Sequence, residues 1–213
     1  MKKYTIITLI ILLTPLLLTS QSIFLEKGTS AGSLGVGIGN VEEEAFYNIH
    51  GSYSLKGIID FTLTYEKSDF DEDAKLNKLR FGTDYLILKQ GSQMPVNWNI
   101  GGSYSFGSIS DEEYAALGVD LSINELRLST GVSRVIKTFI LIAPHASIDY
   151  NRLTATATYG EDSESESDSG INYTVGAHLG IYAGRNLITL NPYFSFGYFS
   201  SAGLRLSFVI NAK

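Results

Sequence analysis

Three side chains of one predicted strand carry the groups that nucleophilic catalysis needs. His145, Ser147 and Asp149 are spaced two residues apart, and alternate residues of a strand share one face. A serine nucleophile needs an adjacent base, and the base needs an orienting acid. The alternation puts this row on the polar face, with isoleucines opposite. We interpret it as an interior lining and predict no catalytic residue. An enzyme stays an alternative, because a bulge at Pro144 would move these three side chains to the lipid-facing side of the strand.

Two further patterns could be mistaken for a metal site and a cofactor site. His50, His145 and His178 are the only histidines, and they fall on three different predicted strands. Imidazole is a common metal ligand, but these positions form no spacing motif, so we predict no metal site. Glycine at every second position of Gly35–Gly39 lacks the strand-to-helix context of a dinucleotide fingerprint. We therefore predict no cofactor.

The run Glu161–Asp168 contains only Glu, Asp and Ser. Runs of this kind are usually solvated and without fixed structure, and this one lacks the spaced pattern of a calcium loop. We predict an exposed acidic loop. Cation-bridged contact with lipopolysaccharide, or a role as an adhesin, remains an alternative for it.

The elements that must position these residues are strands, because apolar and polar residues alternate through most of the chain. Composition agrees: 213 residues include 21 Gly, 13 Tyr and 11 Phe but only 4 Pro. We predict about twelve strands, near residues 31–38, 45–55, 58–66, 77–88, 95–106, 114–123, 126–134, 138–149, 152–159, 171–183, 187–198 and 203–210.

Charge is sorted between the two faces of these predicted strands. One face is nearly free of charge and includes Leu34, Val36, Ile38, Phe61, Leu63, Phe81, Leu117, Val119, Leu121, Ile123, Leu126, Leu128, Val175, Phe194, Leu204, Leu206 and Phe208. The other face collects Asp60, Lys78, Arg80, Asp84, Asp120, Arg127, Asp149, Arg152, Arg205 and the three histidines. Charge on the lipid face of a membrane barrel costs about 2–4 kcal/mol at the midplane, so this sorting indicates a transmembrane barrel with a polar lumen.

The chain opens with the features of an export signal. Lys2 and Lys3 precede an apolar stretch, Ile6–Leu18, and the small polar run Thr19–Ser22 follows. We predict a signal peptide over residues 1–22, with cleavage after Ser20 or Ser22, and one barrel domain over residues 23–213. The apolar stretch is short for a membrane-spanning helix, which needs about 20 residues.

Cysteine and charge exclude several classes of protein. The chain contains no cysteine, which excludes a lipoprotein anchor, disulfides and thiol catalysis. Without Lys2 and Lys3, 14 basic residues face 22 acidic ones, a net charge of −8. An acidic chain argues against nucleic acid as a partner.

Connection lengths predict which strand ends face outward. Short connections occupy 56–57, 90–94, 124–125, 150–151 and 184–186, whereas longer and acidic ones occupy 42–44, 68–76, 108–113 and 160–169. Outer-membrane barrels have short periplasmic turns and longer external loops. The longer set, together with the short Ser133–Lys137 connection, is therefore predicted to be external.

The chain resembles small bacterial outer-membrane β-barrels of the OmpA-like and opacity-type group. The resemblance is carried by the signal, by Gly32–Gly39, by Gly57–Tyr65 and by the closing run Gly203–Phe208. It implies a closed antiparallel barrel in a Gram-negative outer membrane. Many members have eight strands and end on the terminal aromatic residue, whereas Val209–Lys213 follow here. The spacing of His145 and Ser147 is similar to that in lipid A deacylase barrels, whose site faces lipid.

We therefore predict an all-β, closed transmembrane barrel of about 12 strands, with 8 or 10 as alternatives. The predicted function is that of a non-enzymatic, monomeric barrel, either a passive small-solute channel or a structural barrel. The alternatives are a lipid-modifying enzyme and a surface adhesin. Membrane lipid and lipopolysaccharide are the expected partners. Lumen charges would either pair and fill the interior or line a pore, and the small inward residues favour some open volume.

Overall fold

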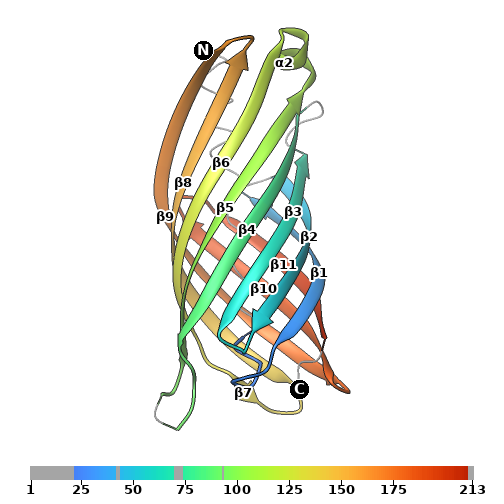
Figure 1. Ribbon diagram of the computed structural model, residues 1–213, viewed down its shortest axis with the longest axis vertical. Helices are drawn as coiled ribbons and strands as arrows, with labels where there is room; N and C mark the ends of the chain where they lie inside the picture. Colours follow the sequence, from blue (N-terminus) through green and yellow to red (C-terminus); the bar gives the residue numbers. More distant parts are fainter. Residues whose placement is uncertain (1–21, 42–43, 70–73, 93, 211–213) are drawn as a thin grey trace.

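Long antiparallel strands, inclined to the long axis of the molecule, form the wall of a closed barrel (Figure 1). The computed structural model describes residues 22–41, 44–69, 74–92 and 94–210. Its elements are β1 (Ala31–Val41), β2 (Glu44–Leu55), β3 (Ile59–Asp69), β4 (Ala74–Leu88), β5 (Asn97–Asp111), α2 (Glu112–Ala116), β6 (Val119–Ser133), β7 (Ile136–Lys137), β8 (Leu141–Tyr159), β9 (Asp162–Ala183), β10 (Asn186–Gly197) and β11 (Ser201–Ile210). Among the described residues, no helix is both long and apolar enough to cross a membrane.

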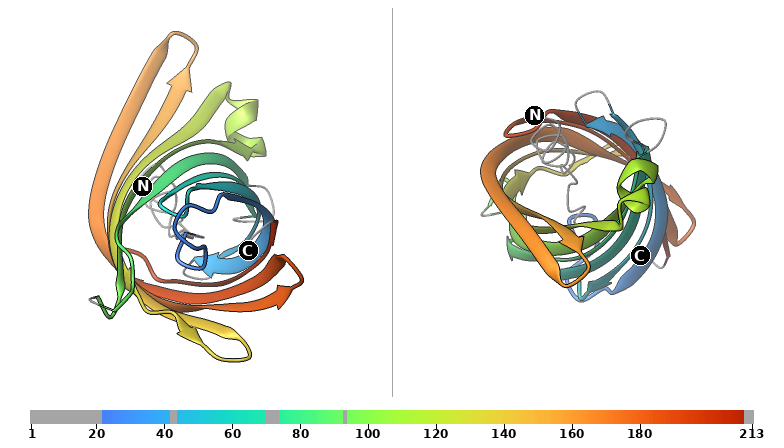
Figure 2. Two further views of the ribbon diagram at one scale, coloured as in Figure 1. Left: turned by 60° about the horizontal axis from the view of Figure 1, so that its bottom comes forward. Right: turned by 90° about the horizontal axis from the view of Figure 1, so that it is seen from above.

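Ten strands close on themselves, and the two-residue β7 is appended to β8. Consecutive strands pair antiparallel except β6 and β7, and two further pairings complete the circle, β1 with β11 and β6 with β8. Figure 2 shows the resulting ring from both ends. The all-β closed barrel predicted from the sequence is confirmed, with ten strands, one of the predicted alternatives.

Two predicted turns lie inside continuous strands. The predicted strand 114–123 is wrong at its start, where residues 114–116 belong to helix α2; from Val119 onward it joins the predicted strand 126–134 in the single strand β6. The predicted strands 138–149 and 152–159 form the single strand β8 from Leu141 onward. Real turns of this barrel use positive φ, as at Lys56 and Gly57, and the residues at 124–125 and 150–151 have no such geometry. As a consequence, Ser133–Lys137 leads into β7 at the end of the barrel that carries the short 184–186 turn, which is the predicted periplasmic end, and not at the predicted external end.

The charge sorting read from the alternation is confirmed over most of the wall. Apolar side chains cover the outside; large exposed ones include Leu34, Val36, Ile38, Phe61, Leu63, Phe81, Leu128, Val175, Phe194, Leu206 and Phe208. Charged side chains are buried inside: Asp60, Glu66, Lys78, Arg80, Asp84, Glu125, Arg127, Asp149 and Arg205. The exterior therefore matches hydrocarbon, as a membrane barrel requires.

The face assignment is wrong where β6 and β8 rise above the shorter strands. Val119, Leu121 and Ile123 face inward and are buried, whereas Asp120 and Arg152 face outward and are exposed. Figure 1 shows β6, β8 and β9 extending past β1–β3 at the upper end. Beyond the bilayer the outside is water, so polar residues face out and apolar residues fill the mouth.

The acidic run is part of a strand and not a loop. Asp162–Asp168 begins β9, pairs with β8 and is exposed. Thr154 and Thr156 of β8 share hydroxyl hydrogen bonds with Ser167 and Ser165, each with 2.8 Å between the oxygens. The strict alternation of serine and acid lets serines face the threonines, while the acids share the other face.

Candidate functional site

The lumen holds two groups of ion pairs, and the first is centred on Glu125. Lys78 Nζ lies 2.8 Å from Glu66 Oε1 and 3.7 Å from Glu125 Oε2, and Arg80 Nη2 lies 2.9 Å from the same Glu125 oxygen. Ser105 Oγ also donates to Glu125 Oε2, at 3.0 Å. All of these side chains are buried. Strand register produces the group, because Glu66 and Lys78 are directly paired positions of β3 and β4.

The second group converges on Asp149. Its Oδ2 lies 2.8 Å from Arg127 Nη2 and accepts hydrogen bonds from Ser147 Oγ at 3.3 Å and Thr174 Oγ1 at 3.2 Å. Thr174 Oγ1 also lies 3.0 Å from Ser195 Oγ, which extends the network to β10. Opposite charges on facing strands thus neutralise each other across the interior.

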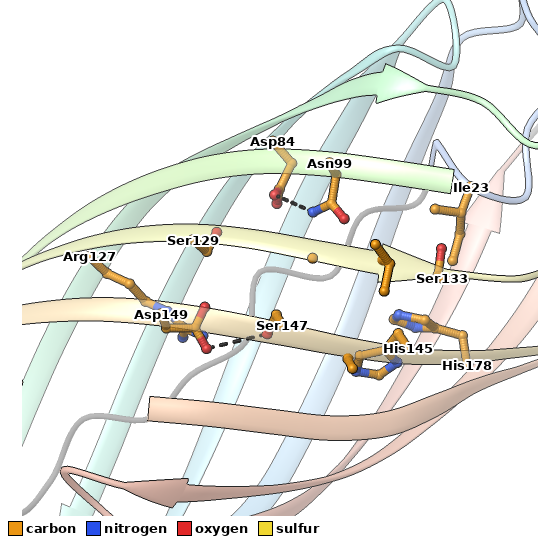
Figure 3. A pocket seen from close by; sticks show the side chains of 13 residues that line it. Ile23, Asp84, Asn99, Arg127, Ser129, Ser133, His145, Ser147, Asp149 and His178 are labelled. Carbon is orange, nitrogen blue, oxygen red and sulfur yellow. Dashed lines mark hydrogen bonds and ion pairs between the residues drawn. The ribbon is translucent and has the colours of Figure 1, made fainter. Parts of the chain in front are cut away.

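The predicted catalytic alternative does not have the geometry of a triad. Figure 3 shows Ser147 directed to Asp149, while the ring of His145 stacks on that of His178 with 4.6 Å between centroids. The β8–β9 register runs through Pro144 without a shift, and the β6–β8 register is regular from His145 onward, so the row faces the lumen. The cavity beside these residues measures about 30 Å³, enough for about one water molecule. An acyl chain has no place there.

The histidines are separated into two environments. His50 Nε2 lies 2.9 Å from Ser207 Oγ and its Nδ1 lies 3.3 Å from Asn48 Oδ1, whereas His178 contacts His145 and the ring of Phe24. Among the described residues, no group of three or more His, Cys, Asp or Glu side chains could hold a metal ion.

Inward glycines provide room for these large side chains and leave little open volume. A Cβ built on Gly35 would lie 2.5 Å from His50 Nε2 and would also meet the carbonyl oxygen of Leu206. A Cβ built on Gly176 would lie 2.7 Å from His145 Cε1. At Gly35 and Gly176, therefore, a histidine ring fills the space that the missing side chain leaves.

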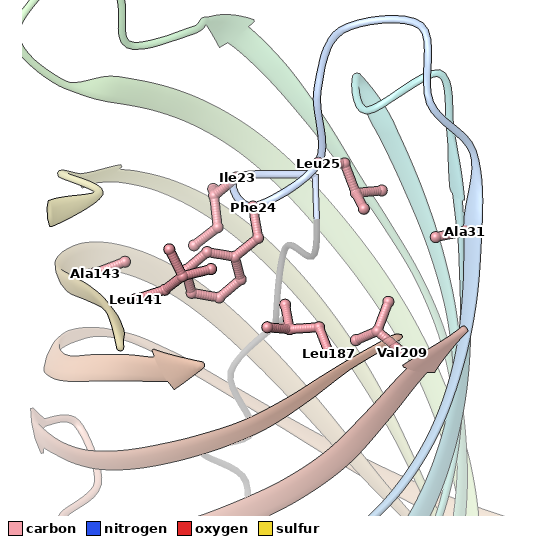
Figure 4. Close-up of a cluster of buried hydrophobic side chains, with 8 residues drawn as sticks. All are labelled: Ile23, Phe24, Leu25, Ala31, Leu141, Ala143, Leu187 and Val209. Atoms are coloured by element: carbon pink, nitrogen blue, oxygen red, sulfur yellow. The ribbon is translucent and has the colours of Figure 1, made fainter. Parts of the chain in front are cut away.

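The first described residues of the chain lie inside the barrel at the predicted periplasmic mouth. Ser22, Ile23, Phe24 and Leu25 are buried inside the barrel, and Figure 4 shows the three apolar side chains packed against the wall. The cluster comprises Ile23, Phe24, Leu25, Ala31, Leu141, Ala143, Leu187 and Val209. We call residues 22–27 the plug segment. A cavity of about 410 Å³ remains on its outer side, next to Lys89 and Lys137.

Lys89, which follows β4, binds the plug segment through its backbone. Its Nζ donates to the carbonyl oxygens of Ser22 (3.1 Å), Leu25 and Gly57 (3.4 Å). Burial lowers the pKa of Lys89, while the nearby Asp60 and Glu26 carboxylates act in the opposite direction. The ammonium thus joins the plug segment to the β2–β3 turn.

A second apolar cluster lies toward the predicted external mouth; it comprises Val41, Phe46, Leu76, Ile123, Leu153, Ala155 and Tyr193. Arg205, just below, has its guanidinium 5.6 Å from the ring centroid of Tyr193. The lumen is therefore layered, with ion pairs in the middle and apolar side chains at both ends.

Comparison with known proteins gives matches by structure alone. Searches of protein-family models and of curated proteins found no match. The β domain of the Bordetella autotransporter BrkA is similar at 8% identity and a TM-score of 0.54, over 87% of this chain and 99% of that one. The fold is that of a bacterial outer-membrane β-barrel. Together with the apolar exterior, it places the protein in the outer membrane.

Two further outer-membrane proteins match over similar lengths. A major outer membrane protein of Thermus thermophilus is 10% identical, with a TM-score of 0.46, over 85% of this chain and 99% of that chain. The N-terminal barrel domain of Pseudomonas aeruginosa OprF is 12% identical, with a TM-score of 0.39, over 87% and 99%.

Sequence reasoning missed the plug segment and the external apolar cluster. The plug segment lies where the export signal is predicted to end, so its apolar residues resemble the end of that signal. The cluster residue on β6, Ile123, follows the alternation, but above the membrane the apolar residues of this strand face inward and the polar ones face outward. The available signal was Asp120, a charged residue that alternates with the apolar residues Val119 and Leu121.

Proposed function

We propose that this outer-membrane barrel is a closed structural barrel that does not conduct solutes, the second of the two non-enzymatic functions predicted from the sequence. The layered lumen carries the proposal. Paired charges fill its centre, and an apolar cluster lies toward each mouth, so side chains occupy much of the described interior.

Liposome swelling tests this function. Vesicles containing the refolded protein should shrink and remain shrunken in a hyperosmotic solution of a small sugar, as empty vesicles do, because the solute cannot enter. The matched positive control is a variant with Arg127, Asp149, Phe24 and Leu25 changed to alanine, which removes part of the centre and of the plug. Re-swelling with the unaltered protein at a rate proportional to its amount would reject the proposal.

A second candidate function, surface binding of a cationic partner, is supported by β9. Asp162, Glu164, Glu166 and Asp168 lie on one face of the strand, and the described residues form no strand pairing with its outer edge before Asn172. An extended edge offers backbone hydrogen bonds to a partner strand, and the acids would select a basic one.

The candidate is tested by replacing the four acids with Asn and Gln and measuring binding of an oligolysine peptide to the protein in detergent. The control replaces Ser163, Ser165, Ser167 and Ser169 with alanine, which keeps the charge. Loss of binding in the first variant alone supports the candidate. The candidate is rejected if the two variants bind the peptide equally well. It is also rejected if the unaltered protein does not bind the peptide.

A further inference from the structure

The exposed charges of the barrel are divided between its two ends. Exposed cations gather at the end that carries the short β2–β3 and β9–β10 turns: Lys27, Lys56, Arg134, Lys137 and Arg185. Among the described side chains of this end, Glu26 is the only exposed acid. Exposed acids gather at the opposite end: Asp120, Glu161, Asp162, Glu164, Glu166 and Asp168. We call the two the basic end and the acidic end.

The cations of the basic end lie at the height of lipid headgroups. Tyr53 and Trp98 are exposed on the outer wall near this end, and aromatic residues of membrane barrels gather at the bilayer interface. Lys56 follows Tyr53 by three residues, and Arg134 lies two residues beyond Val132, the position paired with Trp98. Two or three residues of a tilted strand rise roughly 5–8 Å along the barrel axis. The interfacial layer beside the hydrocarbon core is also about 5–8 Å thick.

The β7–β8 hairpin adds exposed apolar side chains to this end. β7 continues the register that β6 makes with β8, and Figure 1 shows the hairpin at the lower end of the barrel, opposite α2. Phe139 at its tip is 95% exposed and Ile136 is 44% exposed. Arg134 and Lys137 of the same hairpin are exposed as well. An apolar ring among cations fits the boundary between headgroups and acyl chains, where interfacial segments place such residues.

We propose that the basic end is a binding surface for anionic phospholipid headgroups, with the β7–β8 hairpin at its centre. Arg134 and Lys137 bind phosphate oxygens, which a guanidinium contacts through two parallel hydrogen bonds. Phe139 enters the acyl region beside them. A soluble acidic partner would match the charge but would leave this ring in water, so the hairpin favours a lipid.

The acidic end gives the surface a direction. Lysine and arginine near an anionic membrane surface are attracted to it, whereas carboxylates are repelled. The two leaflets therefore meet different charges, and an anionic leaflet at the basic end is the favourable arrangement. In the predicted orientation of the barrel, that leaflet is the periplasmic one.

The first test uses Trp98, the only tryptophan of the chain, which is 40% exposed on the outer wall near the basic end. The refolded protein is placed in phosphatidylcholine vesicles that contain a brominated lipid, either phosphatidylcholine or the anionic phosphatidylglycerol, because bromine quenches tryptophan on contact. At equal amounts, we expect the brominated phosphatidylglycerol to quench at least threefold more effectively. The difference should disappear near 1 M salt, where charges are screened beyond about 3 Å.

Two charge-matched variants locate the preference. Arg134→Gln/Lys137→Gln should abolish it, whereas Lys75→Gln/Arg152→Gln removes the same charge from the acidic end and should leave it unchanged. Heat modifiability shows that each variant is folded, and the salt series on the unaltered protein decides the matter where one is not. Equal quenching by the two lipids in the unaltered protein, or equal loss in the two variants, would overturn the proposal.

A second measurement follows the hairpin tip, with the tryptophan moved to it by Trp98→Phe/Phe139→Trp. Brominated phosphatidylglycerol should quench the new tryptophan, and its emission should lie at shorter wavelength in vesicles containing phosphatidylglycerol than in pure phosphatidylcholine. Aqueous acrylamide should quench it less in the anionic vesicles. Equally strong acrylamide quenching in both would place the ring in water, fit a soluble acidic partner and overturn the proposal.

Discussion

Arg127 and Asp149 form a buried ion pair across the β6–β8 interface, with 2.8 Å between Nη2 and Oδ2. The pair lies between the apolar clusters, so removing one partner leaves the other without compensation. Breaking a buried pair costs about 3–5 kcal/mol, whereas apolar replacement of both partners is often nearly neutral. We expect Arg127→Met to lower the free energy of unfolding in urea by this amount and the Arg127→Met/Asp149→Leu double variant to recover most of it. A loss below about 1 kcal/mol, typical of an exposed pair, would contradict this.

Gly35 and Gly51 provide a matched pair of substitutions. A methyl group on Gly35 would clash with His50 and with the Leu206 backbone, whereas one on the lipid-facing Gly51 would lie 3.4 Å from Leu34. Overpacking costs about 1–3 kcal/mol. We expect Gly35→Ala to reduce the yield of heat-modifiable folded barrel and Gly51→Ala to leave it unchanged. Equal yields would mean that His50 can move aside.

The plug segment should contribute to stability through Leu25, which is almost fully buried in the periplasmic cluster. Truncating a buried leucine costs about 2–5 kcal/mol. Leu25→Ala should therefore lower the unfolding free energy well beyond Leu34→Ala, which alters an exposed leucine. Similar losses for the two variants would show that the segment does not pack in the barrel.

Lys89 gives a prediction for pH dependence. Its pKa in the folded chain is lowered by burial from 10.5, so the unfolded chain binds more protons between the lowered value and 10.5. Stability attributable to Lys89 therefore rises with pH across that window. We expect the unfolding free energy of the unaltered protein, relative to Lys89→Met, to increase as the pH approaches 10.5. Parallel pH profiles would contradict the assignment.

Ser147 should have no catalytic role, because its hydroxyl donates to Asp149 and lies inside the lumen. Cells producing Ser147→Ala and the unaltered protein should contain the same lipid A species by mass spectrometry. Loss of a deacylated species in the variant alone would restore the enzyme alternative.

Period-two alternation predicted the barrel, its apolar exterior and most buried charges, because lipid imposes one rule on every strand. The same rule failed for Val119 and Asp120, where β6 leaves the membrane and water replaces lipid outside. The leading count of about twelve strands was higher than the ten observed, which was one of the predicted alternatives, for a related reason. Polar pairs such as Asn124-Glu125 look like turns in sequence, yet Glu125 is the inward acceptor for Arg80 and Lys78.

The side-chain contacts that fill the lumen could not be predicted, since they join residues that are distant in the sequence. Phe24 reaches His178, and Lys89 reaches Leu25, only after the barrel closes. Local patterns do not encode these distances. The two interpretations of the inward charges, a paired network or a pore lining, consequently remained open until register placed Lys78 opposite Glu66.

Single-channel recording tests closure of the lumen most directly. The refolded mature chain, shown to be folded by heat modifiability, is inserted into planar lipid bilayers in concentrated potassium chloride. A closed barrel predicts folded protein in the membrane with no conductance steps above the bare bilayer. Stable steps whose size follows the salt concentration would show a continuous aqueous path and contradict the account.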